Sequence, residues 1–214
     1  MSTYSGNNTQ SNKLIVLNSR HLDESKNPIP PHFTKSEKGE DGLWSEIGQC
    51  TGFKARLVKV SPETKEYKSK DGKTVDTKEM VKLLFASEDS EESYLLSLTY
   101  RMASRDLFNS ILNLETFDGL DVSAFRNKKG YEKFSLKQNG EYVPGKYTYE
   151  EFKAKIKMVE IRKKLESDPT DLNDMLKLEL KGVNDKIAKA NSGASPAATS
   201  KVEVEEDDES SIPF

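Results

Sequence analysis

Apolar and polar residues alternate along the middle of this chain with the period of two that is typical of β-strands. In Ser93–Arg101, the apolar positions of one face are Tyr94, Leu96, Leu98 and Tyr100. Similar stretches, bounded by turn signals such as Asn139-Gly140, predict five central strands. These strands cover residues 47–60, 80–86, 93–101, 120–126 and 131–137.

The first of these strands changes phase part-way along its length. Its apolar side chains slip by one position, in the order Phe53, Ala55, Leu57, Val58 and Val60. A β-bulge produces such a slip, because one extra residue turns the following side chains to the other face. We therefore expect a bent first strand, followed over residues 61–78 by a charged hairpin with Asp71-Gly72 at its turn.

The segment before this strand is expected to be mostly irregular. Residues 13–17 are apolar and predict a short edge strand. Residues 18–45 contain Pro28, Pro30 and Pro31 among several charges, which favours an extended loop.

A helical pattern follows the third strand. Ser104 is a good N-cap residue, and Asp106 suits the first turn of a helix. One apolar stripe comes next, made of Leu107, Phe108, Ile111, Leu112 and Leu114. Three strands, one helix and two strands is the element order of an OB-fold, a five-stranded barrel that binds single strands. The sequence therefore predicts a mainly β protein with α additions; an SH3-like barrel or another small α+β sheet remains the alternative.

Two amphipathic helices are expected after the barrel. Thr148-x-x-Glu151 is a capping box, and the helix it opens would carry Tyr149, Phe152, Ile156 and Val159 on one face. Asp168-Pro169 supplies an N-cap and a proline at the first helical position of the second. Its stripe is Leu172, Leu176, Leu180, Val183 and Ile187, interrupted by Gly182. The pattern leaves open whether these helices cover the barrel, each other or a second copy.

The expected organisation has five parts. They are a frayed N-terminus (1–12), an OB-fold domain (13–147), a helical extension (148–190), a flexible linker (191–200) and an acidic tail (201–214). The chain is 34% hydrophobic and 32% charged over 214 residues, with one cysteine, Cys50. A single cysteine and the lack of a membrane-length apolar run or signal peptide favour a cytosolic protein.

Charge is distributed unevenly along the chain. The whole sequence has 33 basic and 36 acidic residues, of which one Lys and six acids lie in 201–214. The tail therefore has a net charge of −5, and residues 1–200 have a net charge of +2. A mobile acidic segment can fold over a basic groove when no other polyanion occupies it.

The last eight residues, DDESSIPF, place three acids before an apolar ending. This ending resembles the C-terminal tip of bacterial and some phage single-stranded DNA-binding proteins. The resemblance implies that the tip recruits replication and recombination proteins and competes with DNA for the groove. The tip residues would be Asp207, Asp208, Glu209, Ile212, Pro213 and Phe214. The bacterial Gly/Gln-rich linker is missing, so a divergent phage-type protein is expected and the oligomeric state stays open.

Binding a single strand without reading its sequence requires cations for the phosphates and aromatic faces for the bases. The richest segment is 122–147, with six basic residues against two acids. Phase assigns Phe134 and Leu136 to the core and Tyr131 and Lys133 to the groove. Tyr94 and Tyr100 flank Leu96 and Leu98 on an apolar face, which favours the core over a base for both rings. The candidates are Phe53, Lys54, Arg56, Lys59, Tyr100, Arg101, Arg105, Phe125, Arg126, Lys128, Lys129, Tyr131 and Lys133.

Catalytic signals are weak by comparison. The sequence contains no Walker-type or dinucleotide glycine pattern, no nucleophile elbow and no HExxH. His21, His32 and Cys50 lack zinc-ligand spacing, so neither a metal nor a cofactor is expected. The sequence predicts a non-enzymatic single-stranded DNA-binding protein. The alternatives are an acidic-tailed interaction or chaperone protein, and a strand-annealing or RNA-binding protein.

Overall fold

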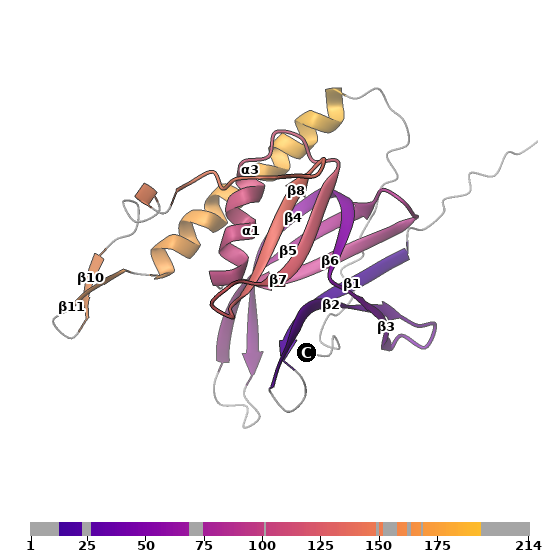
Figure 1. Cartoon of the computed structure of the whole chain (residues 1–214), viewed down its shortest axis with the longest axis horizontal. Coiled ribbons are helices and arrows are strands. Elements are labelled where there is room, and N and C mark those ends of the chain that lie inside the picture. Colours follow the sequence, from indigo (N-terminus) through magenta and orange to yellow (C-terminus); the bar gives the residue numbers. More distant parts are fainter. Residues whose placement is uncertain are drawn as a thin grey trace, which may run out of the picture.

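In the computed structural model, nine strands form one strongly curved mixed sheet, and two helices lie against it (Figure 1). The structure describes residues 13–22, 27–68, 75–100, 102–148, 150–151, 158–161, 164–167 and 169–193. The strands are β1 Lys13–Leu22, β2 Pro28–Lys38, β3 Trp44–Cys50, β4 Gly52–Lys68, β5 Val75–Ser87, β6 Glu92–Thr99, β7 Leu120–Arg126, β8 Glu132–Gln138 and β9 Glu141–Tyr142. The helices are α1 Met102–Leu112 and α3 Pro169–Gly193.

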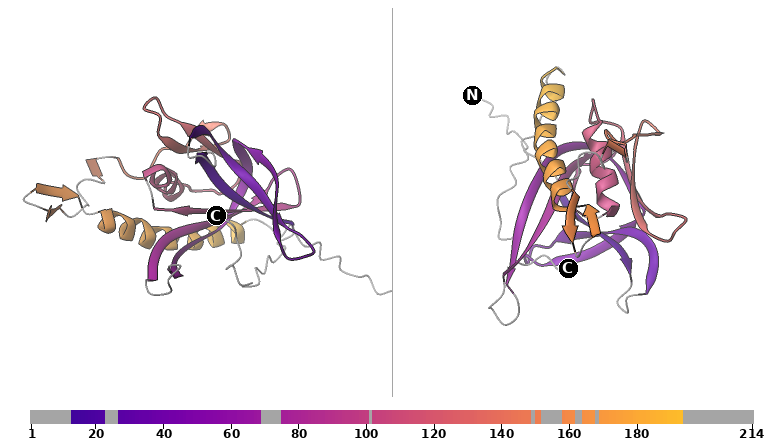
Figure 2. Two further views of the ribbon diagram at one scale, coloured as in Figure 1. Left: turned by 90° about the horizontal axis from the view of Figure 1, so that it is seen from below. Right: turned by 90° about the vertical axis from the view of Figure 1, so that its left-hand side faces the viewer.

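The strand order across the sheet is β3-β2-β1-β6-β5-β4-β7-β8-β9. The pair β1 and β6 is parallel, and all other neighbours are antiparallel. The sheet curls until strands far apart in this order meet across the core (Figure 2). The Phe33 ring of β2 stacks on Phe134 of β8 at 5.9 Å and meets Phe53 of β4 edge-on at 5.5 Å.

The predicted OB-fold barrel is wrong, because the sheet is open and has nine strands rather than five. Most of the strands that the sequence did not predict lie in residues 13–50, which the sequence pattern assigns largely to a loop. β1 is also not an edge strand, since it lies between β2 and β6. Pairing of β1 with a distant parallel strand leaves no local signal in the sequence.

The prolines of β2 explain the loop prediction. Pro28 opens the strand, and Pro30 and Pro31 fall where the β1–β2 register is interrupted, between the pairs Arg20↔His32 and Leu22↔Pro28. The β2–β3 ladder begins only at Phe33. Proline lacks an N–H, so it is tolerated in a strand only where no ladder hydrogen bond is required. Here the tertiary structure supplies such a place.

The single strand predicted over residues 47–60 is two strands. β3 ends at Cys50, opposite Phe33, and β4 starts at Gly52, opposite Ser123 of β7. The chain therefore changes partner at Thr51. A Cβ on Gly52 would come within 2.9 Å of the Val122 carbonyl and the Ser123 Cβ, so glycine permits this close approach.

The predicted β-bulge is confirmed. The β4–β5 register shifts between Leu57 and Lys59, which leaves Val58 as the extra residue. Phe53, Ala55 and Leu57 are buried before it, and Val60 is buried after it. The hairpin predicted over 61–78 also forms, since Lys68 pairs with Val75, although its turn lies outside the described residues.

Helix α1 covers one end of the core with the predicted stripe, and all five of its apolar residues are buried. The helix begins at Met102, so Ser104 is not its N-cap. β7 spans the predicted residues, and the Asn139-Gly140 turn leads into β9 with φ values of 52° and 88°. Positive φ at both positions is the reason for the Asn-Gly preference in such turns.

The segment after β9 is only partly as predicted. The capping box forms, because the Thr148 N–H donates to Glu151 Oε2 at 2.7 Å and the Glu151 N–H donates to Thr148 Oγ1 at 3.3 Å. The helix does not reach Val159, however, since β10 (Met158–Ile161) pairs with β11 (Lys164–Ser167) in a hairpin that projects from the sheet (Figure 1). Phe152 and Ile156 lie outside the described residues.

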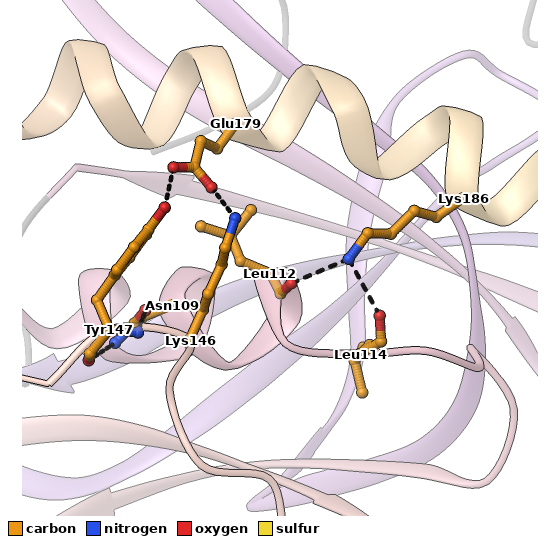
Figure 3. Close-up of polar contacts among 7 residues, drawn as sticks. All are labelled: Asn109, Leu112, Leu114, Lys146, Tyr147, Glu179 and Lys186. Carbon is orange, nitrogen blue, oxygen red and sulfur yellow. Dashed lines mark hydrogen bonds and ion pairs between the residues drawn. The ribbon is translucent and has the colours of Figure 1, made fainter.

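Helix α3 packs on the sheet and on α1. The apolar stripe of this helix therefore covers the rest of the same chain, an arrangement that the sequence pattern left open. Pro169 is its first residue, and Leu176, Leu180, Val183 and Ile187 join the common core. Polar side chains of α3 reach the chain around α1 (Figure 3). Glu179 accepts hydrogen bonds from Lys146 and Tyr147, and the Lys186 ammonium donates to the Leu112 carbonyl at 3.2 Å. The described strands β1 to β8, helix α1 and helix α3 therefore share one core.

Candidate nucleic-acid interface

The tip of the β7–β8 hairpin is held in one shape by the Asn127 side chain together with backbone hydrogen bonds from Asn127 N–H to the Tyr131 carbonyl and from Gly130 N–H to the Asn127 carbonyl, both at 2.9 Å. Asn127 Oδ1 accepts hydrogen bonds from the N–H groups of Lys129 at 3.0 Å and Tyr131 at 2.9 Å. Gly130 has a φ of 82°, which other residues adopt only with strain. The tip therefore presents its neighbouring side chains from an ordered backbone.

The inward side of the hairpin is tied to β1 and β2. Arg126 and Glu132 are cross-strand partners. The Arg126 guanidinium donates to the Ile29 carbonyl at 2.8 Å, and the Glu132 carboxylate accepts a hydrogen bond from Ser19. Both charged residues thus fasten the hairpin to strands β1 and β2 across the curved sheet. Arg126 is only partly accessible as a phosphate ligand.

The outward side of the hairpin carries exposed aromatic rings. Phe125 is opposite Lys133 and Asn127 is opposite Tyr131, so all four lie on one face. Phe125 is 43% exposed and Tyr131 is 61% exposed, so both rings are accessible on this face. Lys128 and Lys129 at the tip are exposed. Lys133 pairs with Asp106 of α1, so its charge is partly neutralised.

The predicted phase of β8 is confirmed. Phe134 and Leu136 are 5% and 2% exposed, and they lie in the core. Tyr131 and Lys133 take the opposite side, as the alternation requires.

The cations of β4 lie farther along the sheet and have acidic neighbours. Lys54 is exposed but stands opposite Asp121 of β7. Arg56 lies 3.8 Å from Asp118. Lys59, next to the bulge, is exposed. The acids reduce the positive potential that Lys54 and Arg56 contribute.

Two aromatic candidates are core residues. Phe53 is 8% exposed and contacts the Phe33, Phe85 and Tyr94 rings. Tyr100 is 7% exposed and packs edge-on against Phe108 of α1 at 5.4 Å. Burial raises the pKa of Tyr100, and the nearby charges of Glu79 and Asp174 add to the shift. Neither ring is accessible for a base to stack on.

Arg101 and Arg105 are the remaining residues that the sequence predicts for nucleic-acid binding. Arg105 donates to Asn173 Oδ1 of α3 from Nε at 3.2 Å and from Nη2 at 2.8 Å. Burial lowers its pKa. It therefore joins the two helices α1 and α3. Arg101 lies outside the described residues.

A cleft that the sequence analysis missed lies beside the hairpin. It has a volume of about 690 Å³ and is lined by Ile29–His32 and Gln49–Gly52. It adjoins β7, because Arg126 bonds to Ile29 and the Ala124 N–H donates to the Thr51 carbonyl at 2.9 Å. We call it the β2–β4 cleft. The Pro30-Pro31 pair was its sequence signal, since two adjacent residues without N–H groups exclude a neighbouring strand.

Among the described residues, no three His, Cys, Asp or Glu side chains gather where they could hold a metal ion. None of the helices in this part of the chain is long and apolar enough to cross a membrane. The tip residues Asp207, Asp208, Glu209, Ile212, Pro213 and Phe214 lie outside the described residues.

Comparison with known proteins does not assign the site. No family model, curated protein or solved structure gives a significant match to this chain. The function must therefore be inferred from the side chains described above.

Proposed function

We propose that this chain is a non-enzymatic single-stranded DNA-binding protein that holds the strand without reading its sequence. The observation that carries the proposal is the outward face of the β7–β8 hairpin. Phe125 and Tyr131 expose their rings there, next to the exposed cations Lys128 and Lys129. Exposed rings and cations on one rigid support are the two requirements for binding single strands.

Each group has a defined task in this proposal. Bases would stack on Phe125 and Tyr131, which accept any base because every base has a π-face. Lys128 and Lys129 would neutralise phosphates and release counterions, so that affinity falls with salt. The Asn127 turn and the Arg126 and Glu132 anchors keep these groups in place before the strand arrives. A preordered site loses less conformational entropy on binding.

The acidic segment has a second task in the proposal. Residues 207–214 would recruit replication, recombination or repair proteins and would compete with DNA for the basic surface. The support is their resemblance to the tips of bacterial and phage single-stranded DNA-binding proteins, together with the uneven charge of the chain.

Fluorescence anisotropy with a labelled oligo-dT, repeated over a salt series, tests the binding proposal. Phe125→Ala/Tyr131→Ala should weaken binding by tenfold or more, since each stacked base contributes about 1–3 kcal/mol. The slope of log K against log salt is negative, and Lys128→Ser/Lys129→Ser should make it less steep by about 1.4, which is about 0.7 for each lost phosphate contact. The matched control is Lys181→Ser/Lys189→Ser on the exposed side of α3, which makes the same charge change elsewhere.

The rival functions predict other results in the same assay. Absence of oligo-dT binding at low salt would contradict the proposal and favour an acidic-tailed interaction protein. Equal or tighter binding of RNA would indicate an RNA-binding protein. Faster pairing of complementary strands in the presence of the protein would indicate strand annealing, which uses the same surface chemistry.

A further inference from the structure

The outward face of the β7–β8 hairpin continues from its tip along the whole ribbon to β9. Three cross-strand pairs lie on it, in the order Phe125↔Lys133, Ser123↔Ser135 and Asp121↔Lys137. The hydroxyl oxygens of Ser123 and Ser135 are 2.7 Å apart, so both side chains point to the same side of the sheet. None of these six residues is buried, whereas Val122 and Leu136 of the opposite phase lie in the core.

A second exposed aromatic ring lies at the far end of this face. Tyr142 of β9 is the cross-strand partner of Lys137, and it is 71% exposed. The Lys137 ammonium lies over the Tyr142 ring, 4.7 Å from the ring centroid. Such a cation–π contact orients the ring, and the exposure of Tyr142 leaves room for a base. The far end therefore repeats the combination of ring and cation found at the hairpin tip.

Small side chains separate the two aromatic ends. Ser123 and Ser135 lie between them, and Gly52 of β4 is opposite Ser123. Side chains of this size do not obstruct a chain that runs along the surface from one end to the other. The two hydroxyls can also donate to phosphate or sugar oxygens, as serines commonly do in protein–DNA contacts.

The spacing of the two ends suits a short run of nucleotides. Phe125 is opposite Lys133, which is four residues before Lys137, and Tyr131 is six residues before it. At about 3.4 Å per residue, these separations are roughly 14 and 20 Å. Stacked bases of one strand advance about 3.4 Å per nucleotide, so the two ends are about four to six nucleotides apart.

The charges at the far end suit a polyanion. Lys54 of β4 and Lys137 of β8 stand on either side of Asp121 of β7, so this row has two cations and one acid. Lys54 is exposed. Glu141 pairs with Gln138, so it belongs to the opposite phase of β9. The positive charge of this row would neutralise phosphate next to the Tyr142 ring.

We propose that Tyr142 and Lys137 form a second stacking site for the same DNA strand, which runs along the outward face from the hairpin tip to β9. This inference rests on the proposed function, and it defines the length of strand that full affinity requires. When one strand contacts both sites, the second contact is intramolecular, so the affinity exceeds that of either site alone. An oligonucleotide too short to reach both sites lacks this gain.

Anisotropy with oligo-dT of increasing length, from about 2 to about 16 nucleotides, measures the span. The affinity of the wild type should rise about tenfold or more once the length exceeds about four to six nucleotides. Tyr142→Ala should lose this rise, yet bind the shortest oligonucleotides within about twofold of the wild type, since the hairpin tip remains. The control is Leu178→Ala on α3, which removes a side chain of similar exposure (72%) and should retain the rise.

Asp121→Asn tests the far end by a gain of affinity. Removal of the acid between Lys54 and Lys137 should tighten the binding of long oligo-dT about two- to fivefold at low salt, and the gain should shrink as salt rises. Lys137→Gln should weaken binding and make the salt slope less steep by about 0.7. Asp185→Asn removes the same charge from the exposed side of α3 and should leave the affinity unchanged.

The outcomes separate this inference from the proposed function. Absence of any oligonucleotide binding would overturn both. A length dependence that is unchanged in Tyr142→Ala, or an affinity that is unchanged in Asp121→Asn, would overturn the second site alone and leave the hairpin tip standing. A gain of affinity cannot come from misfolding, so Asp121→Asn remains informative even if Tyr142→Ala does not fold.

Discussion

The side-chain amide of Asn184 on α3 pairs with the backbone of Val60 in β4. The Val60 N–H donates to Asn184 Oδ1 at 2.9 Å, and Asn184 Nδ2 donates to the Val60 carbonyl at 2.7 Å. Val60 follows the bulge, where β4 has left β7 and pairs only with β5. Asn184 thus replaces a missing strand neighbour and locks α3 to the sheet.

Asn184→Ala should destabilise the protein by about 2–3 kcal/mol, because two buried backbone groups of Val60 lose their partners. Urea denaturation measures the free energy of unfolding. The control, Asp185→Ala, removes an exposed side chain from the same helix turn and should change the stability by no more than about 0.5 kcal/mol. Equal stability of the two variants would mean that water satisfies Val60 equally well.

Tyr100→Phe should leave the stability unchanged or raise it by up to about 1 kcal/mol. The hydroxyl is buried and has no hydrogen-bond partner among the described residues, so its removal relieves an unsatisfied group. Tyr94→Phe is the contrast, because the Tyr94 hydroxyl donates to Glu92 at 2.9 Å and its loss should cost about 1 kcal/mol. Tyr100→Phe should also bind oligo-dT normally, whereas a clear loss of affinity would return Tyr100 to the interface.

Glu179 should stabilise the fold at neutral pH and lose this effect at strongly alkaline pH. The hydrogen bond from Lys146 to Glu179 raises the pKa of Lys146. The pKa of Tyr147 is raised most by burial and next by its hydrogen bond to Glu179. Both groups hold their protons more tightly when folded. Their stabilisation is therefore complete below their ordinary pKa values, about 10, and is lost as pH rises through the higher folded values.

Urea denaturation of wild type and Glu179→Gln across a pH series measures this effect. The difference should be about 0.5–1.5 kcal/mol near neutrality, since Lys146 is partly exposed, and it should shrink above about pH 10. Asp185→Asn, which also neutralises an acid of α3, should show no such convergence. A difference that is constant to pH 11 would contradict the role of the two protons.

Deletion of residues 207–214 should leave oligo-dT affinity equal or higher, with the larger gain at low salt, because the deletion removes three acids that would compete for the cations. Anisotropy measures the affinity. Phe214→Ala retains all six tail acids and should bind oligo-dT as the wild type does at each salt concentration. A marked loss of DNA affinity on deletion would contradict a competing tail.

Much of the local structure could be predicted. The slip from Leu57 to Val60 marks the bulge, Asn139-Gly140 marks a turn with two positive φ values, and the stripe from Leu176 to Ile187 marks the buried side of α3. Each of these signals depends on residues that lie at most 11 positions apart in the sequence, so the local sequence is enough to produce it.

The candidate site could be predicted only in part. Alternation places Tyr131 on the outer face of the hairpin and Phe134 in the core, as the structure does. For Tyr100, which shares an apolar face with Leu96 and Leu98, the pattern favoured the core, and Tyr100 is buried. Alternation alone did not show that Phe53 faces the core, because a period of two defines two faces without saying which is covered. For the β2–β4 cleft, the Pro30-Pro31 pair is a local signal that β2 lacks a strand neighbour there, but the position of β2 beside the start of β4 has no local signature.

The periodic elements, the turns and the uneven charge of the chain follow from side-chain type and spacing, so the sequence alone accounts for them. The pairing of β1 with β6 and the place of Pro30 and Pro31 within a strand come from the folded arrangement of the sheet. The fold also brings Arg105 and Arg126 to partners in other parts of the chain. These outcomes depend on partners between 68 and 97 residues away for the two arginines, and spacing along the chain does not encode such pairings.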